Sequence, residues 1–247
     1  MHFLNKYVLL PAALGLAGVP QVAAAQEPQF APVMAEFSGE GALMLPPMPA
    51  LDINGAGTIE LWMAARWPQD PGYDPALIAY VGPQGARFAA VITGDRQAIG
   101  VYAGANYAEV PFDFSDAGLH HIALITMGDT ISVMVDGETL GELDFGFAML
   151  PANSFTIGAM GKYSPFIGGI GQVRIWDEPI DPDVLIQYSW RQIAESGPDA
   201  HPDIDALVGV SAFANPETGG FIFVGDPEDA EAASFREDPI DDADIGN

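Results

Sequence analysis

Cysteine is absent from the 247-residue sequence, and basic residues are scarce. Without cysteine no disulfide can staple the chain, so its stability must come from buried apolar surface, helped by any metal ion it binds. Only 8 residues are Lys or Arg against 34 Asp or Glu, and the formal net charge is −26. Such a surface repels phosphates and anionic membrane faces, which excludes nucleic acid as a partner. Solubility in salty surroundings is the simplest reason for this charge, and binding of cations or of a cationic partner is the alternative.

Long hydrophobic runs are also missing, and the apolar stretch at the N-terminus is a short one. It spans residues 8–19, follows Lys6 and precedes three alanines at 23–25. This order of charge, apolar run and small residues is typical of a secretion signal, whereas a buried core helix is the alternative. The run falls short of the roughly 20 residues that cross a bilayer. We therefore expect a signal peptide over residues 1–25, export to the bacterial periplasm or exterior, and no membrane span after its removal.

The rest of the sequence consists mainly of short alternating segments between turn residues. Gly and Pro number 28 and 21, and no long helical period is visible. The expected strands cover residues 42–45, 58–64, 76–81, 88–93, 98–102, 121–126, 130–135, 140–145, 155–158 and 169–176. Many short strands joined by hairpin-length turns predict an all-β, two-sheet antiparallel jelly-roll sandwich over residues 26–197. Within it, Ile59, Leu61, Val133 and Val135 should face inward.

One short helix and an acidic extension follow the sandwich. Asp181 suits an N-cap, Pro182 the first helical position, and Gly197 the stop. Residues 198–247 form the expected acidic extension. Its apolar stretches at 206–213 and 221–224 predict a hairpin that docks on the sandwich, and the remaining residues, rich in Asp, Glu and Ala, predict a disordered tail.

Six segments occur in the order found in laminin-G-like jelly rolls of the concanavalin A-like lectin/glucanase family. They are FSGEG at 37–41, TIELW at 58–62, LHHIA at 119–123, VMVDG at 133–137, FIGGIGQVRIW at 166–176 and DPDVL at 181–185. The chain resembles that family from Phe37 to about Gln187, with Leu119 where tryptophan is usual. The resemblance implies the sandwich fold. It implies little about function, because the matching positions are mostly structural.

No catalytic constellation stands out. Glu60 on an alternating strand is best explained as a carboxylate bound to backbone or to an arginine, with a catalytic or metal role as the alternative. His120 and His121 should point to opposite faces of one strand. Glu142 and Asp144 begin a glycosidase-like run that lacks its second glutamate. A glycoside hydrolase or polysaccharide lyase is therefore the less favoured hypothesis.

A non-enzymatic binding module is the favoured hypothesis, with carbohydrate or an adhesive contact as its target. The candidate ligand-binding residues are the aromatics and one amide near predicted turns: Trp67, Tyr73, Tyr102, Asn106, Tyr107 and Tyr163. Each could instead pack in the core or at its rim. Loop carboxylates at Asp70, Asp74, Asp95 and Asp113 suit Ca²⁺, although their spacing is not diagnostic and leaves the metal unidentified. The partner is then a glycan or, if the protein is a structural component of the envelope, an envelope or extracellular protein.

Overall fold

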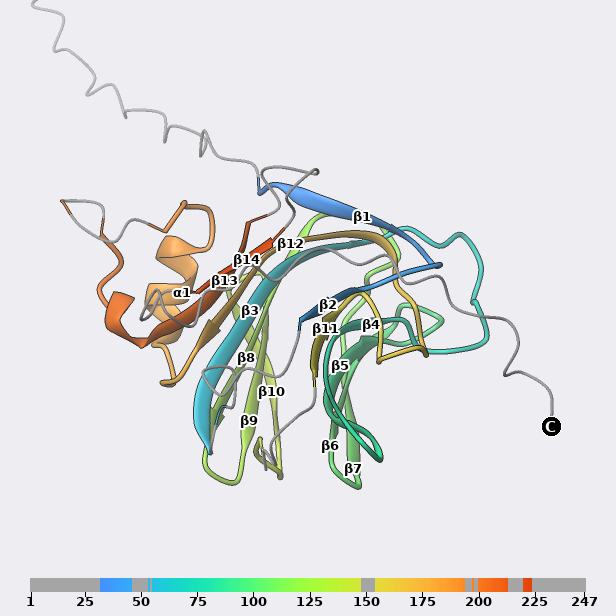
Figure 1. Cartoon of the computed structure of the whole chain (residues 1–247), viewed down its shortest axis with the longest axis horizontal. Coiled ribbons are helices and arrows are strands. Elements are labelled where there is room, and N and C mark those ends of the chain that lie inside the picture. The colour runs from blue at the N-terminus through green and yellow to red at the C-terminus, as the bar shows by residue number, and fades with distance from the viewer. Residues whose placement is uncertain are drawn as a thin grey trace, which may run out of the picture.

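Two antiparallel sheets face each other in the computed structural model (Figure 1). The structure describes residues 32–45, 53, 55–147, 154–193, 197, 200–212 and 220–223. The expected signal peptide and the tail from residue 224 onward lie outside these residues. The prediction of a two-sheet antiparallel jelly-roll sandwich is confirmed.

Sheet A has eight strands in the order β10-β9-β8-β3-β12-β13-β14, with β1 also paired to β12. Their bounds are β1 Met34–Ser38, β3 Ala56–Ala65, β8 His120–Met127, β9 Ile131–Val135, β10 Glu138–Leu143, β12 Ile167–Trp176, β13 Leu207–Ala212 and β14 Gly220–Phe223. The long strands β3 and β12 lie side by side at its centre and curve over the top of the sandwich (Figure 1).

Sheet B has six strands in the order β2-β11-β4-β5-β6-β7. Their bounds are β2 Leu43–Leu45, β4 Ala76–Gly82, β5 Gly85–Ile92, β6 Ala98–Ala103, β7 Asn106–Pro111 and β11 Ser154–Ile157. Strand β7 forms one edge of the sheet, and it lies outside the strands expected from the sequence.

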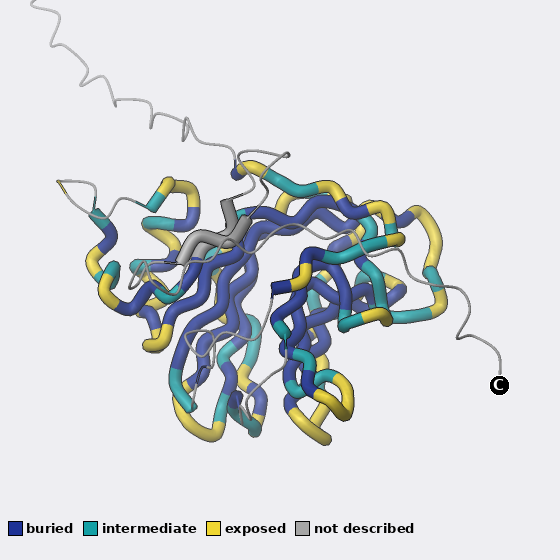
Figure 2. The backbone as a smooth tube through the Cα atoms, in the orientation of Figure 1, coloured by how far each residue is buried: buried dark blue, intermediate teal, exposed yellow. Residues whose placement is uncertain are grey.

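The main core lies between the sheets and follows the period of two along each strand. Ile59 and Leu61 of β3 and Val133 and Val135 of β9 are buried in it, as predicted. Figure 2 shows both sheets as buried along most of their length, with exposed residues gathered at the hairpin tips. The alternation therefore sets which face of each strand is inward.

The opposite face of β3 is buried as well, because a second layer covers it. Helix α1 (Pro182–Tyr188) and the segment after it pack against the outer face of sheet A, beside the short 3₁₀ turn Ile204–Ala206 (Figure 1). Trp176, Ile180, Leu185 and Leu207 form a second apolar cluster there. Strands β13 and β14, the two stretches expected to form a hairpin, pair with each other and join sheet A through β12.

Helix α1 begins as predicted, with the Asp181 side chain accepting a hydrogen bond from the Asp183 amide, but it ends at Tyr188. The prediction that it runs to Gly197 is wrong. The carbonyls of Tyr188 and Ser189 accept hydrogen bonds from Arg174 and Trp62 of sheet A. These side chains take the carbonyls that further helical turns would use, so the chain leaves the helix and lies along the sheet.

Candidate ligand-binding site

A cavity of about 610 Å³ opens at one end of sheet B, within the size range of small-ligand sites. We call it the acidic cleft. Its wall is the segment that joins β3 to β4, its base is the turn between β5 and β6, and its far side is β7. Its lining residues are Asp70, Gly72, Tyr73, Asp74, Thr93, Gly94, Asp95, Gln97, Ala98, Glu109 and Pro111.

Gly94 joins the wall of the cleft to its base. Its carbonyl accepts a hydrogen bond from the Trp67 indole at 2.8 Å, and its amide donates to Oδ1 of Asp74 at 3.0 Å. A Cβ at this position would collide with the Asp70 carboxylate. Glycine is therefore needed for the segment that carries Asp70 and Asp74 to approach the turn this closely.

Four carboxylates line the cleft, and each is fixed through one of its two oxygens. Oδ1 of Asp70 accepts from the Gly72 amide at 2.8 Å, and Oδ1 of Asp95 accepts from the Thr93 hydroxyl at 2.7 Å. Oε1 of Glu109 accepts from the Tyr107 hydroxyl at 2.6 Å, and Asp74 is held as described above. Among the described residues, no hydrogen bond reaches the second oxygen of any of the four. Four oriented acceptor oxygens thus remain for a ligand.

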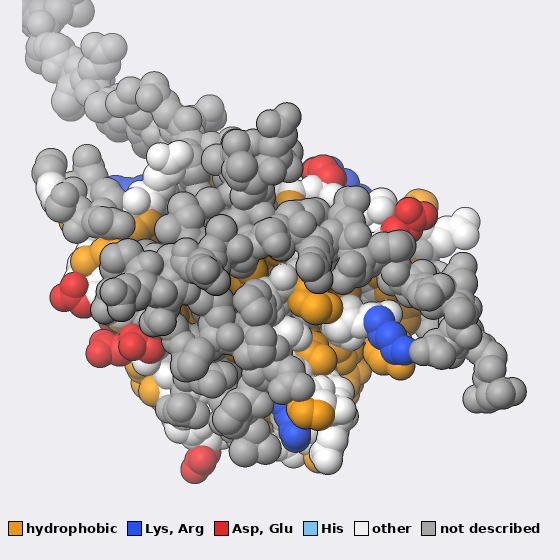
Figure 3. Space-filling model, in the orientation of Figure 1, with side chains coloured by type: hydrophobic (Ala, Val, Ile, Leu, Met, Phe, Trp, Pro, Cys, Tyr) orange, Lys and Arg blue, Asp and Glu red, His pale blue; other side chains and the backbone are white. Residues whose placement is uncertain are grey.

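All four of these side chains are acidic. The hydrogen bond from Thr93, with that from the Gln97 amide, lowers the pKa of Asp95. None of the lining residues is basic. On the face drawn in Figure 3, the visible acidic side chains (red) lie mostly near the edges of the molecule. The lining of the cleft therefore carries negative charge without a basic residue to offset it.

A pair of tyrosines lies beside the cleft on β6 and β7. Tyr102 and Tyr107 are directly opposite each other in the register, with ring centroids 4.3 Å apart and planes at 31°. Burial, then the hydrogen bond to Glu109, raises the pKa of Tyr107, so its hydroxyl stays protonated and donates. Gly100 leaves room for this ring, since a Cβ there would lie 2.8 Å from the Tyr107 hydroxyl oxygen.

The six candidate residues are divided by the fold. Tyr73 lines the cleft, Tyr102 and Tyr107 form the pair beside it, and Asn106 is exposed at the start of β7. Trp67 is 2% exposed and packs edge-on against Phe166, so it supports the cleft from within and presents no face to solvent. Tyr163 is exposed in the segment between β11 and β12 and does not line the cleft.

Of the four loop aspartates, Asp70, Asp74 and Asp95 reach the cleft. Asp113 instead accepts from the Ser115 amide at 2.9 Å and from Gln97. Within the described ranges, no three acidic, histidine or cysteine side chains are arranged to hold a metal ion together.

Sequence reasoning missed Glu109 and Gln97, which both line the cleft. The signal for Glu109 is present in the sequence: Tyr107 and Glu109 alternate with Ala108 and Val110, which face the core. That alternation was hidden because the neighbouring Tyr107 and Asn106 suggested a binding turn instead of a strand.

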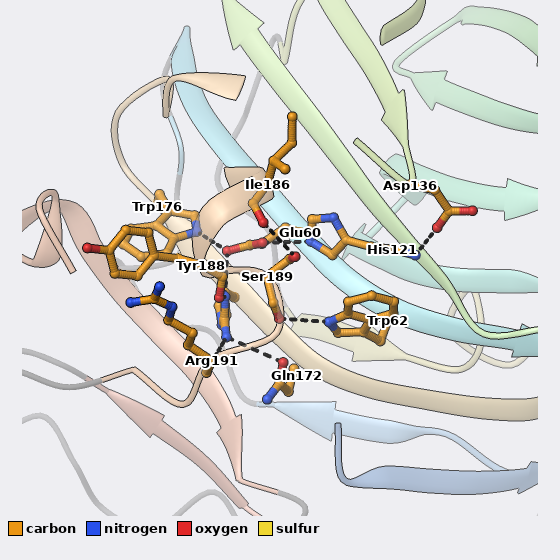
Figure 4. Close-up of polar contacts among 11 residues, drawn as sticks. Glu60, Trp62, His121, Asp136, Gln172, Trp176, Ile186, Tyr188, Ser189 and Arg191 are labelled. Carbon is orange, nitrogen blue, oxygen red and sulfur yellow. Dashed lines mark hydrogen bonds and ion pairs between the residues drawn. The ribbon is translucent and has the colours of Figure 1, made fainter. Parts of the chain in front are cut away.

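A buried polar network occupies the outer face of sheet A, between the sheet and the segment after α1 (Figure 4). Glu60, only 1% exposed, accepts hydrogen bonds from three side chains. They are His121 Nε2 at 2.7 Å, Trp176 Nε1 at 3.1 Å and Arg174 at 3.2 Å. Arg174 also donates to the carbonyls of Tyr188 and Arg191. The sequence-based explanation of Glu60 as a carboxylate paired with an arginine matches this contact.

The charge on Glu60 is stabilised within the network. Burial alone would raise its pKa, but the charge of Arg174 and the hydrogen bond from His121 lower it from 4.5 to about 2. The carboxylate is therefore ionised and enclosed. A substrate cannot reach it, so the network joins the C-terminal segment to the sheet instead of providing a reaction centre.

His120 faces away from this network, as predicted for neighbouring residues on a strand. Its Nδ1 lies 2.7 Å from Asp136 and its Nε2 3.1 Å from Asp116. The hydrogen bond to Asp136 raises the pKa of His120, and the hydrogen bond to Asp116 raises it by a smaller amount. The imidazole thereby links the segment before β8 to the turn between β9 and β10.

With the fold and both clusters of polar side chains in place, comparison with known proteins assigns the family. Residues 37–184 match the family described as the concanavalin A-like lectin/glucanases superfamily. The chain belongs to this superfamily. No curated protein matches its sequence.

Three solved structures share the concanavalin A-like fold of this chain. The carbohydrate-binding module CBM40 of the Ruminococcus gnavus IT-sialidase, bound to α2,3-sialyllactose, is 18% identical with a TM-score of 0.52, over 62% of this chain and 95% of that one. A Bacteroides ovatus protein that is assumed to bind carbohydrate is 16% identical with a TM-score of 0.54, over 80% of this chain and 52% of that one. Domain 4 of an extracellular arabinanase from Geobacillus stearothermophilus, in complex with arabinotriose, is 16% identical with a TM-score of 0.50, over 62% and 75%. At these identities the likeness concerns the fold.

A second, smaller pocket of about 210 Å³ lies on the outer face of the concanavalin A-like sandwich, beside α1. We call it the α1 pocket. Leu119, Ile186 and Trp190 line it and are 38%, 45% and 37% exposed. Its other lining residues are Trp62, His121, Asp136, Gly137 and Ser189.

In the described part of the chain, no helix has the length and apolar character needed to cross a membrane.

Proposed function

We propose that this protein is an exported, non-enzymatic carbohydrate-binding module whose sugar site is the acidic cleft. One observation carries the proposal: four carboxylates around a cavity of about 610 Å³ are each fixed through one oxygen and leave the other oxygen to accept a hydrogen bond. A sugar presents several hydroxyl donors at fixed angles. Oriented acceptors of this kind suit it better than they suit an apolar ligand.

The tyrosine pair adds a surface for the apolar face of a sugar ring. Tyr107 is 39% exposed, and its hydroxyl, bound to Glu109, keeps the ring in place. Aromatic rings with one polar edge combine contact area with a hydrogen bond, which suits a ligand with one apolar face and many hydroxyls. Cleft and ring together supply both halves of sugar recognition.

We propose a non-enzymatic role because the candidate carboxylates do not form the pair that glycoside cleavage needs. Glycoside cleavage needs a carboxylic acid with a raised pKa beside an ionised one. The pKa of Asp95 is lowered, and that of Glu60 is about 2 in an enclosed network on the other sheet. Glu142 is exposed on β10 and does not line the cleft.

The comparisons favour the same conclusion. One structure with this fold is a carbohydrate-binding module bound to sialyllactose, and another is a complex with arabinotriose. The charge, apolar run and small residues at the N-terminus support export.

A glycan array probed with the purified protein tests the proposal, with and without added Ca²⁺. We expect reproducible binding to a defined group of glycans, weakened at least tenfold by Asp74→Asn together with Tyr107→Ala. Asp129→Asn, which removes an exposed charge at the β8–β9 turn, is the matched control and should leave binding unchanged. An array with no bound glycan would overturn the proposal. Release of shorter sugars from a bound glycan would overturn its non-enzymatic part. Binding that requires Ca²⁺ would show that an ion completes the site.

A role as an interaction component of the envelope is the second candidate function, and the α1 pocket favours it. Three exposed apolar side chains meet there beside the carboxylate of Asp136. With a net charge of −26, the matching partner is a protein segment that places an apolar side chain next to a basic one. If this candidate is right, the glycan array shows no binding and the protein captures one stoichiometric partner from envelope extract. The Ile186→Ser variant should lose this partner, and the Asp74→Asn variant should still bind it. If the Ile186→Ser variant still binds the partner, the α1 pocket is not the binding surface.

A further inference from the structure

We infer that the acidic cleft discriminates sugars by charge: it favours sugars with a protonated amine, accepts neutral ones less well and rejects those with a carboxylate. This inference rests on the cleft being a sugar site. It goes further by naming the chemical class of sugar.

The first step is the charge of the lining. Asp70, Asp74, Asp95 and Glu109 all line the cavity, and its lining includes no lysine, arginine or histidine. Arg96 is a basic residue that directly follows Asp95 in the sequence. It is not among the lining residues, and its guanidinium donates to the Ser115 carbonyl at 3.3 Å. A ligand that enters the cleft therefore meets four negative charges with no positive charge in the lining.

The second step is the hydrogen-bonding character of the free oxygens. An ionised carboxylate only accepts, so each free oxygen needs a donor from the ligand. A sugar carboxylate has only acceptors and would face these oxygens without a hydrogen atom between them. A protonated amine has three donors and a positive charge, so it adds a Coulomb attraction to the charge-assisted hydrogen bond that a neutral hydroxyl would also donate to an ionised carboxylate.

The third step is magnitude. The cleft is open to solvent, and Asp70, Asp95 and Glu109 are exposed, so their field is screened as in water. One pair of unit charges about 4 Å apart in water is worth about 1 kcal/mol, which corresponds to about a fivefold change in affinity. We expect an amine in place of a hydroxyl to tighten binding by about fivefold, and a carboxylate to weaken it by at least as much.

The salt dependence separates charge from shape. The screening length falls from about 8 Å at physiological ionic strength to about 3 Å in 1 M salt. A preference due to charge should shrink to within about twofold in 1 M NaCl, whereas a preference due to the fit of the amine would remain.

The experiment uses two matched series of monosaccharides: glucose, glucosamine and glucuronate, and galactose, galactosamine and galacturonate. Each is titrated at pH 6 into the full chain at constant ionic strength, and the shift of the Gly94 amide is followed by NMR because this amide lies in the cleft. We expect the order amine, neutral, acid in at least one series. The double variant Asp74→Asn, Glu109→Gln should flatten that order while keeping the acceptors for Gly94 and Tyr107. The control Asp129→Asn should keep the order.

The outcomes are distinct. Uronates that bind as well as the amines overturn the inference and leave the sugar site intact. An order that survives 1 M NaCl, or that the double variant and the control retain equally, shows that the preference does not come from these carboxylates and also overturns it. If none of the six sugars shifts Gly94, both the inference and the sugar site at this cleft are lost.

Discussion

Oε2 of Glu60 lies 2.7 Å from Nε2 of His121, although 61 residues separate them in the sequence. They meet because β3 and β8 are paired so that Glu60 lies opposite Ala123 and Trp62 opposite His121, which makes the two side chains diagonal neighbours on one face. The contact fixes the carboxylate that holds Arg174, and Arg174 in turn binds the last residue of α1 and the chain after it. Glu60, whose paired role was the favoured sequence-based explanation, therefore stabilises the outer layer.

Removing the charge of Glu60 should destabilise the protein strongly. Glu60→Gln leaves Arg174 buried without its counter-ion, and breaking such a pair costs about 3–5 kcal/mol. Urea unfolding of the full chain measures the free energy of unfolding. The control Glu138→Gln changes an exposed glutamate and should cost less than about 0.5 kcal/mol. A loss below about 1 kcal/mol for Glu60→Gln would mean that the network contributes little.

Acid should act through the same residue. The pKa of Glu60 is lowered on folding, from 4.5 to about 2. The ionised Glu60 therefore contributes fully to the free energy of unfolding above pH 4.5, and this contribution is lost as the pH falls toward 2. The shift corresponds to about 3 kcal/mol of stability. The free energy of unfolding, measured between pH 6 and 2 for the wild type and Glu60→Gln, should converge at the acid end. Parallel curves would contradict the assignment.

Gly100→Ala should weaken sugar binding by moving an aromatic ring. The new Cβ would lie 2.8 Å from the Tyr107 hydroxyl oxygen and 2.8 Å from Cγ2 of Val91, so the Tyr107 ring and the Val91 side chain must both shift. We expect at least a threefold weaker affinity for a glycan identified on the array, measured by calorimetry. Gly41→Ala, whose Cβ meets no atom within 4 Å, is the control for the loss of a glycine. Unchanged affinity in Gly100→Ala would show that the tyrosine pair takes no part in binding.

His120 should make stability depend on pH near neutrality. Its pKa is raised on folding, first by the hydrogen bond to Asp136, so its contribution is complete below about pH 6.5 and is lost as the pH rises through the raised pKa. His201 acts in the opposite sense, since burial lowers its pKa. Because His201 is present in both the wild type and His120→Asn, comparing these two proteins isolates the effect of His120. The difference between their free energies of unfolding should narrow from pH 6 to pH 9. A gap that widens with pH would reverse the assignment.

The strands and the family were predictable because their signals are local. The alternation of Ile59 and Leu61 with polar neighbours, and the turn at Asp136 and Gly137, need only a few adjacent residues. The end of α1 was not predictable in this way. It depends on Trp62, which lies 127 residues before Ser189 in the sequence, and on Arg174 of β12. Both side chains take carbonyls that a longer helix would use, and only the folded sheet places them there.

By itself the sequence determined the sandwich, its inward faces and the excess of negative charge, because composition and period-two burial are properties of short segments. Only the tertiary structure decided where that charge acts. Asp70, Asp95 and Glu109 come from three separate segments and converge only when the β3–β4 connection folds over the end of sheet B and Trp67 binds Gly94. No spacing in the sequence encodes that meeting, since it follows from strand pairing and from how closely two backbones can approach.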